Sequence, residues 1–103
     1  TSCAVNYGVY VKRNGGSRET AAAVMRRRIH NVLKVASEEG AQALVLGAWG
    51  CGVFGNDPEE IARYFAEFLL AERGKFRNCF KHVVFAVGGR DVANLQAFRN
   101  VFQ

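Results

Sequence analysis

Hydrophobic residues recur at helical spacing in three stretches of the chain, which are residues 19–39, 58–74 and 91–102. The first stretch is followed by Gly40, a residue typical of a helix end. The second opens with Asp57 and Pro58, an N-capping residue and a proline suited to the first helical turn. The spacing therefore predicts three amphipathic helices.

Three shorter stretches have the pattern of strands. Valine and tyrosine alternate in Cys3–Val11, which predicts a strand ending at the turn-forming residues 14–17. Ala43–Leu46 is wholly apolar, as in parallel strands covered on both faces, and His82–Val87 is a further apolar run. Strands that alternate with helices favour an α/β fold with a parallel sheet, in the order β, α, β, α, β, α.

The length and composition fit one globular domain. The chain has 103 residues, of which half are hydrophobic and 22% are charged, so it is not of the disordered class. No apolar run approaches the roughly 20 residues that a membrane span needs, so we expect no membrane segment. The chain opens at Thr1 without methionine, which indicates a processed, trimmed or excerpted chain.

The charges and the cysteines narrow the class of partner. A net charge of +5 favours anionic partners such as phosphates or nucleotides. Cys3, Cys51 and Cys79 fit neither a disulfide framework nor a zinc signature, so we expect a reducing cytoplasm. His30 and His82 have no second ligand at metal-binding spacing, and we predict no metal and no cofactor.

The glycine-rich stretch 47–57 is the strongest candidate for chemistry. It carries four glycines in nine residues and is eleven residues long, whereas most strand-to-helix connections have roughly 2–6. Glycines let successive N–H groups converge on an anion, and the following helix N-terminus adds positive potential. Trp49 and Phe54 offer flat apolar surfaces for a sugar or base, and Cys51 is interpreted as a small residue beside a ligand rather than a nucleophile. A plain connection whose glycines only relieve crowding remains the alternative.

The segment Leu44–Pro58, LVLGAWGCGVFGNDP, resembles the second phosphate-binding loop of bacterial-type poly(ADP-ribose) glycohydrolases, a branch of the macrodomain superfamily. The resemblance covers essentially the whole chain. It implies a three-layer α/β/α macrodomain-like parallel sheet, incomplete here as a βαβαβα segment. Residues 1–103 are then a single C-terminal macrodomain-like segment.

The resemblance also implies a ligand and a site. In that family the loop wraps the diphosphate and distal ribose of ADP-ribose, so ADP-ribose or poly(ADP-ribose) is the expected partner. Phe54 packs against the ribose by the same likeness, and the end of the third strand lies near the adenine side. The implied ligand-binding residues are Gly50, Cys51, Gly52, Val53, Phe54, Gly55, Val87 and Gly88.

The resemblance does not extend to catalysis. Such enzymes carry a triple-glycine loop followed by Gln-Glu-Glu, whose second glutamate is the general acid, and this sequence contains neither motif. The nearest candidate, the pair Glu38 and Glu39, ends an amphipathic helix and is interpreted as solvated. We assign no catalytic residue and expect glycosidase activity only if a missing N-terminal half completes the chain.

Two other functions are weighed against this one. The first is a small, non-catalytic α/β module that binds a nucleotide or protein and self-associates through an open sheet edge. The second is nucleic-acid binding through clusters of basic residues, which only the net charge supports and which is not expected. One such cluster, residues 73–81, is an unspecific polyanion patch, while Arg90 is better placed to meet a phosphate.

Overall fold

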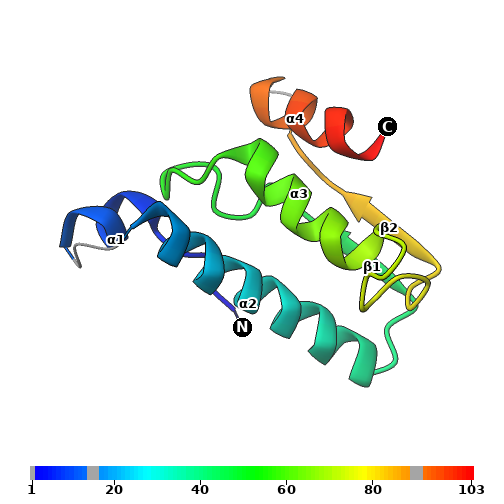
Figure 1. Cartoon of the computed structure of the whole chain (residues 1–103). Helices are drawn as coiled ribbons and strands as arrows, with labels where there is room; N and C mark the ends of the chain where they lie inside the picture. The colour runs from blue at the N-terminus through cyan, green and yellow to red at the C-terminus, as the bar shows by residue number, and fades with distance from the viewer. Residues whose placement is uncertain (1, 14–16, 89–91) are drawn as a thin grey trace.

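The computed structural model describes residues 2–13, 17–88 and 92–103, so the expectations for Gly89, Arg90 and Asp91 lie outside the described residues. The elements in chain order are α1 (Tyr7–Arg13), α2 (Arg18–Glu38), β1 (Ala43–Leu46), α3 (Pro58–Leu69), β2 (His82–Phe85) and α4 (Val92–Phe102) (Figure 1). The strands pair in parallel, with Ala43 opposite His82 and Leu46 opposite Phe85. The expected α/β class and its parallel sheet are confirmed.

The helix α2 forms where the sequence predicts it. Ser17 caps its first turn by accepting a hydrogen bond from the Thr20 N–H. Its buried side chains recur every four residues along one face and are Ala21, Met25, Ile29 and Leu33. Among the described residues no helix is both long and apolar enough to cross a membrane.

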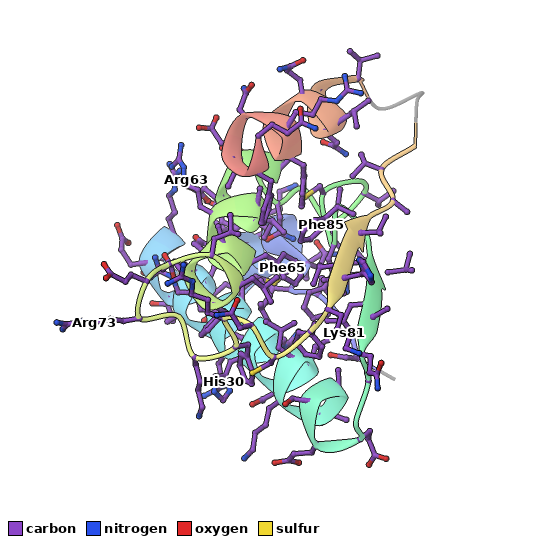
Figure 2. The ribbon with its side chains drawn as sticks, turned by 90° about the vertical axis from the view of Figure 1, so that its right-hand side faces the viewer. His30, Arg63, Phe65, Arg73, Lys81 and Phe85 are labelled. Atoms are coloured by element: carbon purple, nitrogen blue, oxygen red, sulfur yellow. The ribbon has the colours of Figure 1, made fainter. Side chains whose placement is uncertain are left out.

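The helices lie on one face of the sheet. Figure 2 shows the two strands at one side of the molecule, with Phe65 of α3 and Phe85 of β2 pointing toward each other between the layers. Their ring centroids are 5.4 Å apart. The ring of Phe85 also lies 5.1 Å from that of Phe98 and 4.7 Å from that of Phe102, which fixes α4 against the same layer.

The other face of the sheet is bare within the described part of the chain. Val45 is 74% exposed and Val84 is 53% exposed, and the register places them opposite each other. The expectation that β1 is covered on both faces is therefore wrong for this structure. An apolar run indicates that a strand can be buried, but it does not identify the segment that covers the strand. One helical layer of the expected three-layer architecture is present.

The first predicted strand is also wrong, because Tyr7–Arg13 is the helix α1. The Val9 N–H donates to Asn6 Oδ1, with 3.2 Å between N and O, and the Tyr10 N–H donates to the Asn6 carbonyl at 2.9 Å. Asn6 thus acts as an N-cap. Upstream of it, Ala4 and Val5 are buried in the core, which anchors the segment as a short extended lead into a helix.

Candidate functional site

The glycine-rich loop, residues 47–57, lies at the carboxyl edge of the sheet between β1 and α3. The Ala86 N–H donates to the Leu46 carbonyl at 2.7 Å, so the two strands end side by side at this edge. Val87 and Gly88 follow β2 there, close to the base of the loop. Ligands of parallel α/β sheets bind beyond the carboxyl ends of the strands, and this edge is the expected position.

Asn56 closes the loop on itself and on the N-terminal segment. Its side-chain Nδ2 donates to the carbonyls of Val5 at 2.7 Å and Gly50 at 2.8 Å. Its backbone N–H donates to the same Gly50 carbonyl at 3.0 Å. One side chain therefore joins two segments that are 51 residues apart in sequence. In the sequence, the only signal for Asn56 is its place within the segment Leu44–Pro58, which does not predict these hydrogen bonds.

The glycines of the loop have different tasks. Gly50 and Gly55 have φ values of +74° and +77°, which side chains rarely adopt. A Cβ on Gly50 would lie 2.6 Å from Asn56 Nδ2 and 2.7 Å from Ala4 Cβ, so the position requires glycine for space as well. Gly52 is outside that φ region, and a Cβ there meets nothing within 4 Å. Gly55 has the same open space but needs its positive φ, so Gly52 combines open surroundings with a φ that other residues can adopt.

The tip of the loop carries backbone donors without acceptors. Within the described part of the chain, the N–H groups of Gly52, Val53 and Phe54 have no hydrogen-bond partner. The tip is exposed, since Val53 is 99% and Phe54 is 37% accessible. The Phe54 carbonyl accepts from the Gly8 N–H at 3.3 Å, which ties the tip to α1. Three consecutive free amides on a held tip are suited to an anion.

The surroundings of Cys51 disfavour its thiolate, which is the nucleophilic form. Burial raises the pKa of the Cys51 thiol to about 12, and the nearby Asp57 carboxylate acts in the same direction. The Sγ atom lies 3.7 Å from the Trp49 carbonyl and donates to it. A thiol with this pKa stays protonated near neutral pH, which agrees with its interpretation as a small residue in the loop.

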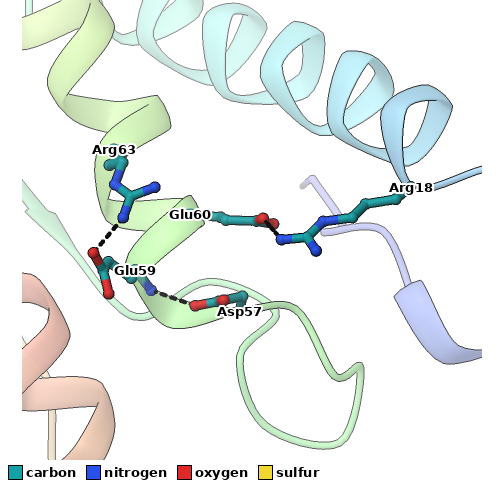
Figure 3. A network of polar contacts seen from close by, with 5 residues as sticks. All are labelled: Arg18, Asp57, Glu59, Glu60 and Arg63. Carbon is teal, nitrogen blue, oxygen red and sulfur yellow. Dashed lines mark hydrogen bonds and ion pairs between the residues drawn. The ribbon is translucent and has the colours of Figure 1, made fainter.

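The N-terminus of α3 is already supplied with negative charge (Figure 3). Asp57 Oδ1 accepts from the Glu59 N–H at 2.9 Å, and Glu60 and Glu59 pair with Arg18 and Arg63. The hydrogen bond to Glu60 raises the pKa of Arg18. The N-cap Asp57 and the first-turn residues Glu59 and Glu60 place carboxylates at this end of α3 and offset the helix dipole, so the expected help from the dipole is reduced and the loop amides are the stronger candidate for binding an anion.

Two hollows flank the loop. An apolar cavity of about 460 Å³ includes Trp49, Gly50 and Phe65 in its lining, and a polar one of about 200 Å³ includes Tyr7, Arg18 and Gly55. The first is within the size range of small-molecule sites. Of the implied ligand-binding residues, Gly50 lines the apolar cavity and Gly55 lines the polar one, while Cys51–Phe54 line neither.

The candidate acids lie far from the loop. Glu38 ends α2, which leads into the amino end of β1, and it pairs with Lys34 at 3.9 Å between Oε1 and Nζ. Glu39 follows it and is exposed. The interpretation of this pair as solvated is confirmed. No group of three described His, Cys, Asp or Glu side chains is arranged to hold a metal ion.

No family model matches the sequence, and no curated protein matches it significantly. Solved structures match closely. Poly(ADP-ribose) glycohydrolase from Thermomonospora curvata aligns with 96% of this chain at 42% identity and a TM-score of 0.86. The enzyme from Deinococcus radiodurans in complex with ADP-ribose aligns with 95% at 39% identity and a TM-score of 0.84. The T. curvata enzyme bound to the inhibitor ADP-HPD aligns with 94% at 41% identity, also with a TM-score of 0.84.

The match covers most of this chain and a minor part of those enzymes. The chain spans 36% of the T. curvata protein and 39% of the D. radiodurans protein in these alignments. Identity near 40% over this length, with TM-scores above 0.8, extends the likeness from the loop motif to the whole fold. The chain is thus similar in sequence and in fold to a segment of the bacterial poly(ADP-ribose) glycohydrolases, as its loop motif predicts.

Proposed function

We propose that this chain is the ADP-ribose-binding, C-terminal segment of a poly(ADP-ribose) glycohydrolase-like macrodomain protein. The observation that carries the proposal is the held loop tip, where the amides of Gly52, Val53 and Phe54 are free and exposed. A solved relative with 39% identity was crystallised with ADP-ribose, which supports the ligand class.

The roles that we propose for the residues come from the family resemblance and agree with their chemistry. The free amides of the tip bind the diphosphate, for which charge-assisted hydrogen bonds are the strong interaction. Gly50, Cys51 and Gly55 shape the loop, and Phe54 packs its ring against a ribose. Val87 and Gly88 line the adenine side of the same edge.

Calorimetric titration with ADP-ribose tests this proposal. We expect binding to the purified chain that is lost when AMP replaces ADP-ribose, because AMP lacks the diphosphate and the second ribose. Equal binding of AMP and ADP-ribose, or of neither, would contradict the assignment.

The chain by itself is proposed to be catalytically inactive. It contains no Gly-Gly-Gly and Gln-Glu-Glu motif, and the carboxylates that the structure describes near the loop have structural roles, since Asp57 caps α3 and Glu60 pairs with Arg18. Purified chain is expected to release no ADP-ribose from poly(ADP-ribose). Addition of the part of the T. curvata enzyme that this chain does not match is expected to restore release. Turnover by the chain alone that is lost in Glu38→Gln or Glu39→Gln would overturn this view.

A second candidate function is a non-catalytic module that self-associates. The exposed pair Val45 and Val84 on the bare sheet face favours it, because parallel sheets are normally covered on both faces. Light scattering separates the two functions. A dimer that becomes monomeric in Val45→Lys with Val84→Lys supports self-association, whereas a monomer at all concentrations refutes it.

Three free cysteines, two of them exposed, support the proposed cytoplasmic location.

A further inference from the structure

The connection between α3 and β2, residues 70–81, carries an excess of positive charge. It contains one acidic residue, Glu72, and has a net charge of +3 in a chain whose total is +5. The four cations are all exposed and are Arg73, Lys75, Arg77 and Lys81. None of them takes part in an ion pair within the described part of the chain, whereas Arg18, Arg26 and Arg63 are each paired with a glutamate.

This connection, which we call the basic loop, has a fixed shape. Phe76 is buried, and its N–H donates to the Phe68 carbonyl at 2.9 Å. Gly74 is packed so closely that a Cβ would lie 2.8 Å from the same carbonyl. The Arg77 N–H donates to the Gly74 carbonyl at 3.2 Å. Gly74 and Phe76 thus anchor the loop, and the cations beside them are exposed, as Figure 2 shows for Arg73.

The helix α2 adds a further cation to this surface. The ring of His30 packs against the basic loop, with its centroid 5.3 Å from that of Phe76. Arg27 lies three residues before His30, which places it on the neighbouring turn of the same helix face. It is exposed and takes part in no ion pair among the described residues. Two segments of the chain therefore bring unpaired cations together.

The basic loop and the glycine-rich loop lie at opposite ends of α3. The helix has 12 residues, which gives a separation of about 18 Å along its axis. The Lys81 N–H donates to the Gln42 carbonyl at 2.7 Å, which fixes the basic loop at the amino edge of the sheet. A ligand that occupies both places must be extended.

We propose that the basic loop, together with Arg27, binds the phosphates of poly(ADP-ribose) at units beyond the one held by the glycine-rich loop. The inference rests on the proposed function and extends it from one ADP-ribose unit to the polymer. Unpaired lysine and arginine side chains bind a polyphosphate chain by releasing its counterions, with no need for base recognition. Single-stranded nucleic-acid sites add exposed aromatic rings for stacking. The aromatic residues of this loop, Phe76 and Phe80, are buried and half-buried, so the loop offers contacts to phosphates without base stacking, and the ADP-ribose site proposed in the same chain favours the ADP-ribose polymer as the polyanion.

Charge reversal at the basic loop tests the proposal. The variant combines Lys75→Glu with Arg77→Glu, and the control combines Lys12→Glu with Arg99→Glu, two exposed cations on α1 and α4. Both variants change the net charge equally. We expect the first to bind labelled poly(ADP-ribose) at least tenfold more weakly, with a salt dependence shallower by about 1 to 2 in log–log slope. The affinity of the basic-loop variant for ADP-ribose is expected to stay within about twofold of the wild-type value. The affinities of the control variant for the polymer and for ADP-ribose are expected to stay within about threefold of the wild-type values.

Three results would overturn the proposal. The first is a loss of polymer affinity in the control as large as that in the basic-loop variant. The second is a loss of ADP-ribose affinity in the basic-loop variant as large as its loss of polymer affinity. The third is competition by a single-stranded RNA as strong as that by poly(ADP-ribose) with the same number of phosphates. The two proposals fail separately. Polymer binding that depends on Lys75 and Arg77 without any binding of ADP-ribose refutes the proposed function alone. ADP-ribose binding without charge-dependent polymer binding refutes this inference alone.

Discussion

The two loops that flank α3 offer different chemistry to solvent. The glycine-rich loop before α3 has no lysine or arginine, and among the described residues three consecutive backbone amides at its tip have no hydrogen-bond partner. In the basic loop after α3, the amides of Gly74, Phe76 and Arg77 are hydrogen-bonded, and four cationic side chains are exposed. Both are held by long-range contacts, the first through Asn56 and the second through Phe76.

This difference teaches how each loop recognises an anion. Backbone amides act only at fixed geometry, so one added Cβ is enough to disable the glycine-rich loop. Long cationic side chains adapt, so binding by the basic loop is expected to tolerate exchange of lysine for arginine and to weaken with salt. Each variant described next tests whether the two loops bind their ligands independently or form one site.

The largest expected effect is that of Gly50→Val. A β-branched residue is strained at φ +74°, and its Cβ would meet Asn56 and Ala4. We expect both stability and ADP-ribose affinity to fall, the affinity by roughly a hundredfold or more because two or more amides are displaced. Gly40→Val is the matched control, since Gly40 has φ +76° with open space around it and lies at the end of α2. It is expected to lose stability only. Unchanged ADP-ribose affinity in Gly50→Val would remove the geometric requirement from the loop.

Phe76→Ala is expected to lower stability while leaving the ADP-ribose affinity of the glycine-rich loop unchanged. The side chain is 5% exposed, and its loss is expected to cost about 3–5 kcal/mol in the free energy of unfolding. Urea denaturation measures this cost, and Phe76→Leu is the control that keeps an apolar anchor. The folded fraction is expected to bind ADP-ribose as the wild type does. Coupled loss of ADP-ribose affinity would mean that the two loops are one site.

Phe54→Ala sharpens the comparison within the glycine-rich loop. Its side chain is partly exposed, and only its carbonyl is bonded, to the Gly8 N–H. We expect ADP-ribose affinity to fall by about tenfold, the size of one lost aromatic contact, with stability unchanged. The ADP-ribose affinity of Phe54→Leu, which keeps apolar area but has no ring, is expected to lie between those of the wild type and Phe54→Ala. A loss as large as that of Gly50→Val would assign the affinity to the ring instead of the amides.

The smallest expected effect concerns thiol reactivity. A pKa of about 12 leaves roughly one Cys51 thiol in ten thousand ionised at pH 8. Burial favours the protonated form in the folded chain, so alkylation of Cys51 is expected to stay slow until the pH approaches 12 or the chain unfolds. Mass spectrometry after iodoacetamide at pH 8 compares it with the exposed Cys3 and Cys79, which are expected to react first. Fast modification of Cys51 would show that the loop opens.

The sequence predicts those parts of the fold that local signals determine. Asp57 and Pro58 define the start of α3, and the apolar run Ala43–Leu46 coincides with β1. The error at Tyr7–Arg13 arises because alternation over a few residues also fits a short helix, and the capping residue Asn6 was the better signal. The exposure of Val45 was unpredictable because it depends on which segments cover the sheet.

Some features of the candidate site could also be predicted from local sequence signals, and others could not. The position of the loop could be predicted from its glycines and its length. The hydrogen bond from Asn56 to Val5 could not, because it joins residues 51 positions apart. The carboxylates of Glu59 and Glu60 were visible in the sequence, and their offset of the helix dipole follows from the first turn of α3 alone.

The central claim is that the free amides at the loop tip bind ADP-ribose, and Gly52→Val tests it most directly. Gly52 has an ordinary φ, and a Cβ there meets nothing within 4 Å, so thermal unfolding is expected to be close to that of wild type. A bulky side chain at this position blocks close approach of a ligand to the amides. Calorimetric titration is therefore predicted to show a loss of affinity of roughly a hundredfold or more, from two displaced hydrogen bonds of about 1.5–3 kcal/mol each. Affinity equal to that of the wild type, in a variant that unfolds at the same temperature, would contradict the account.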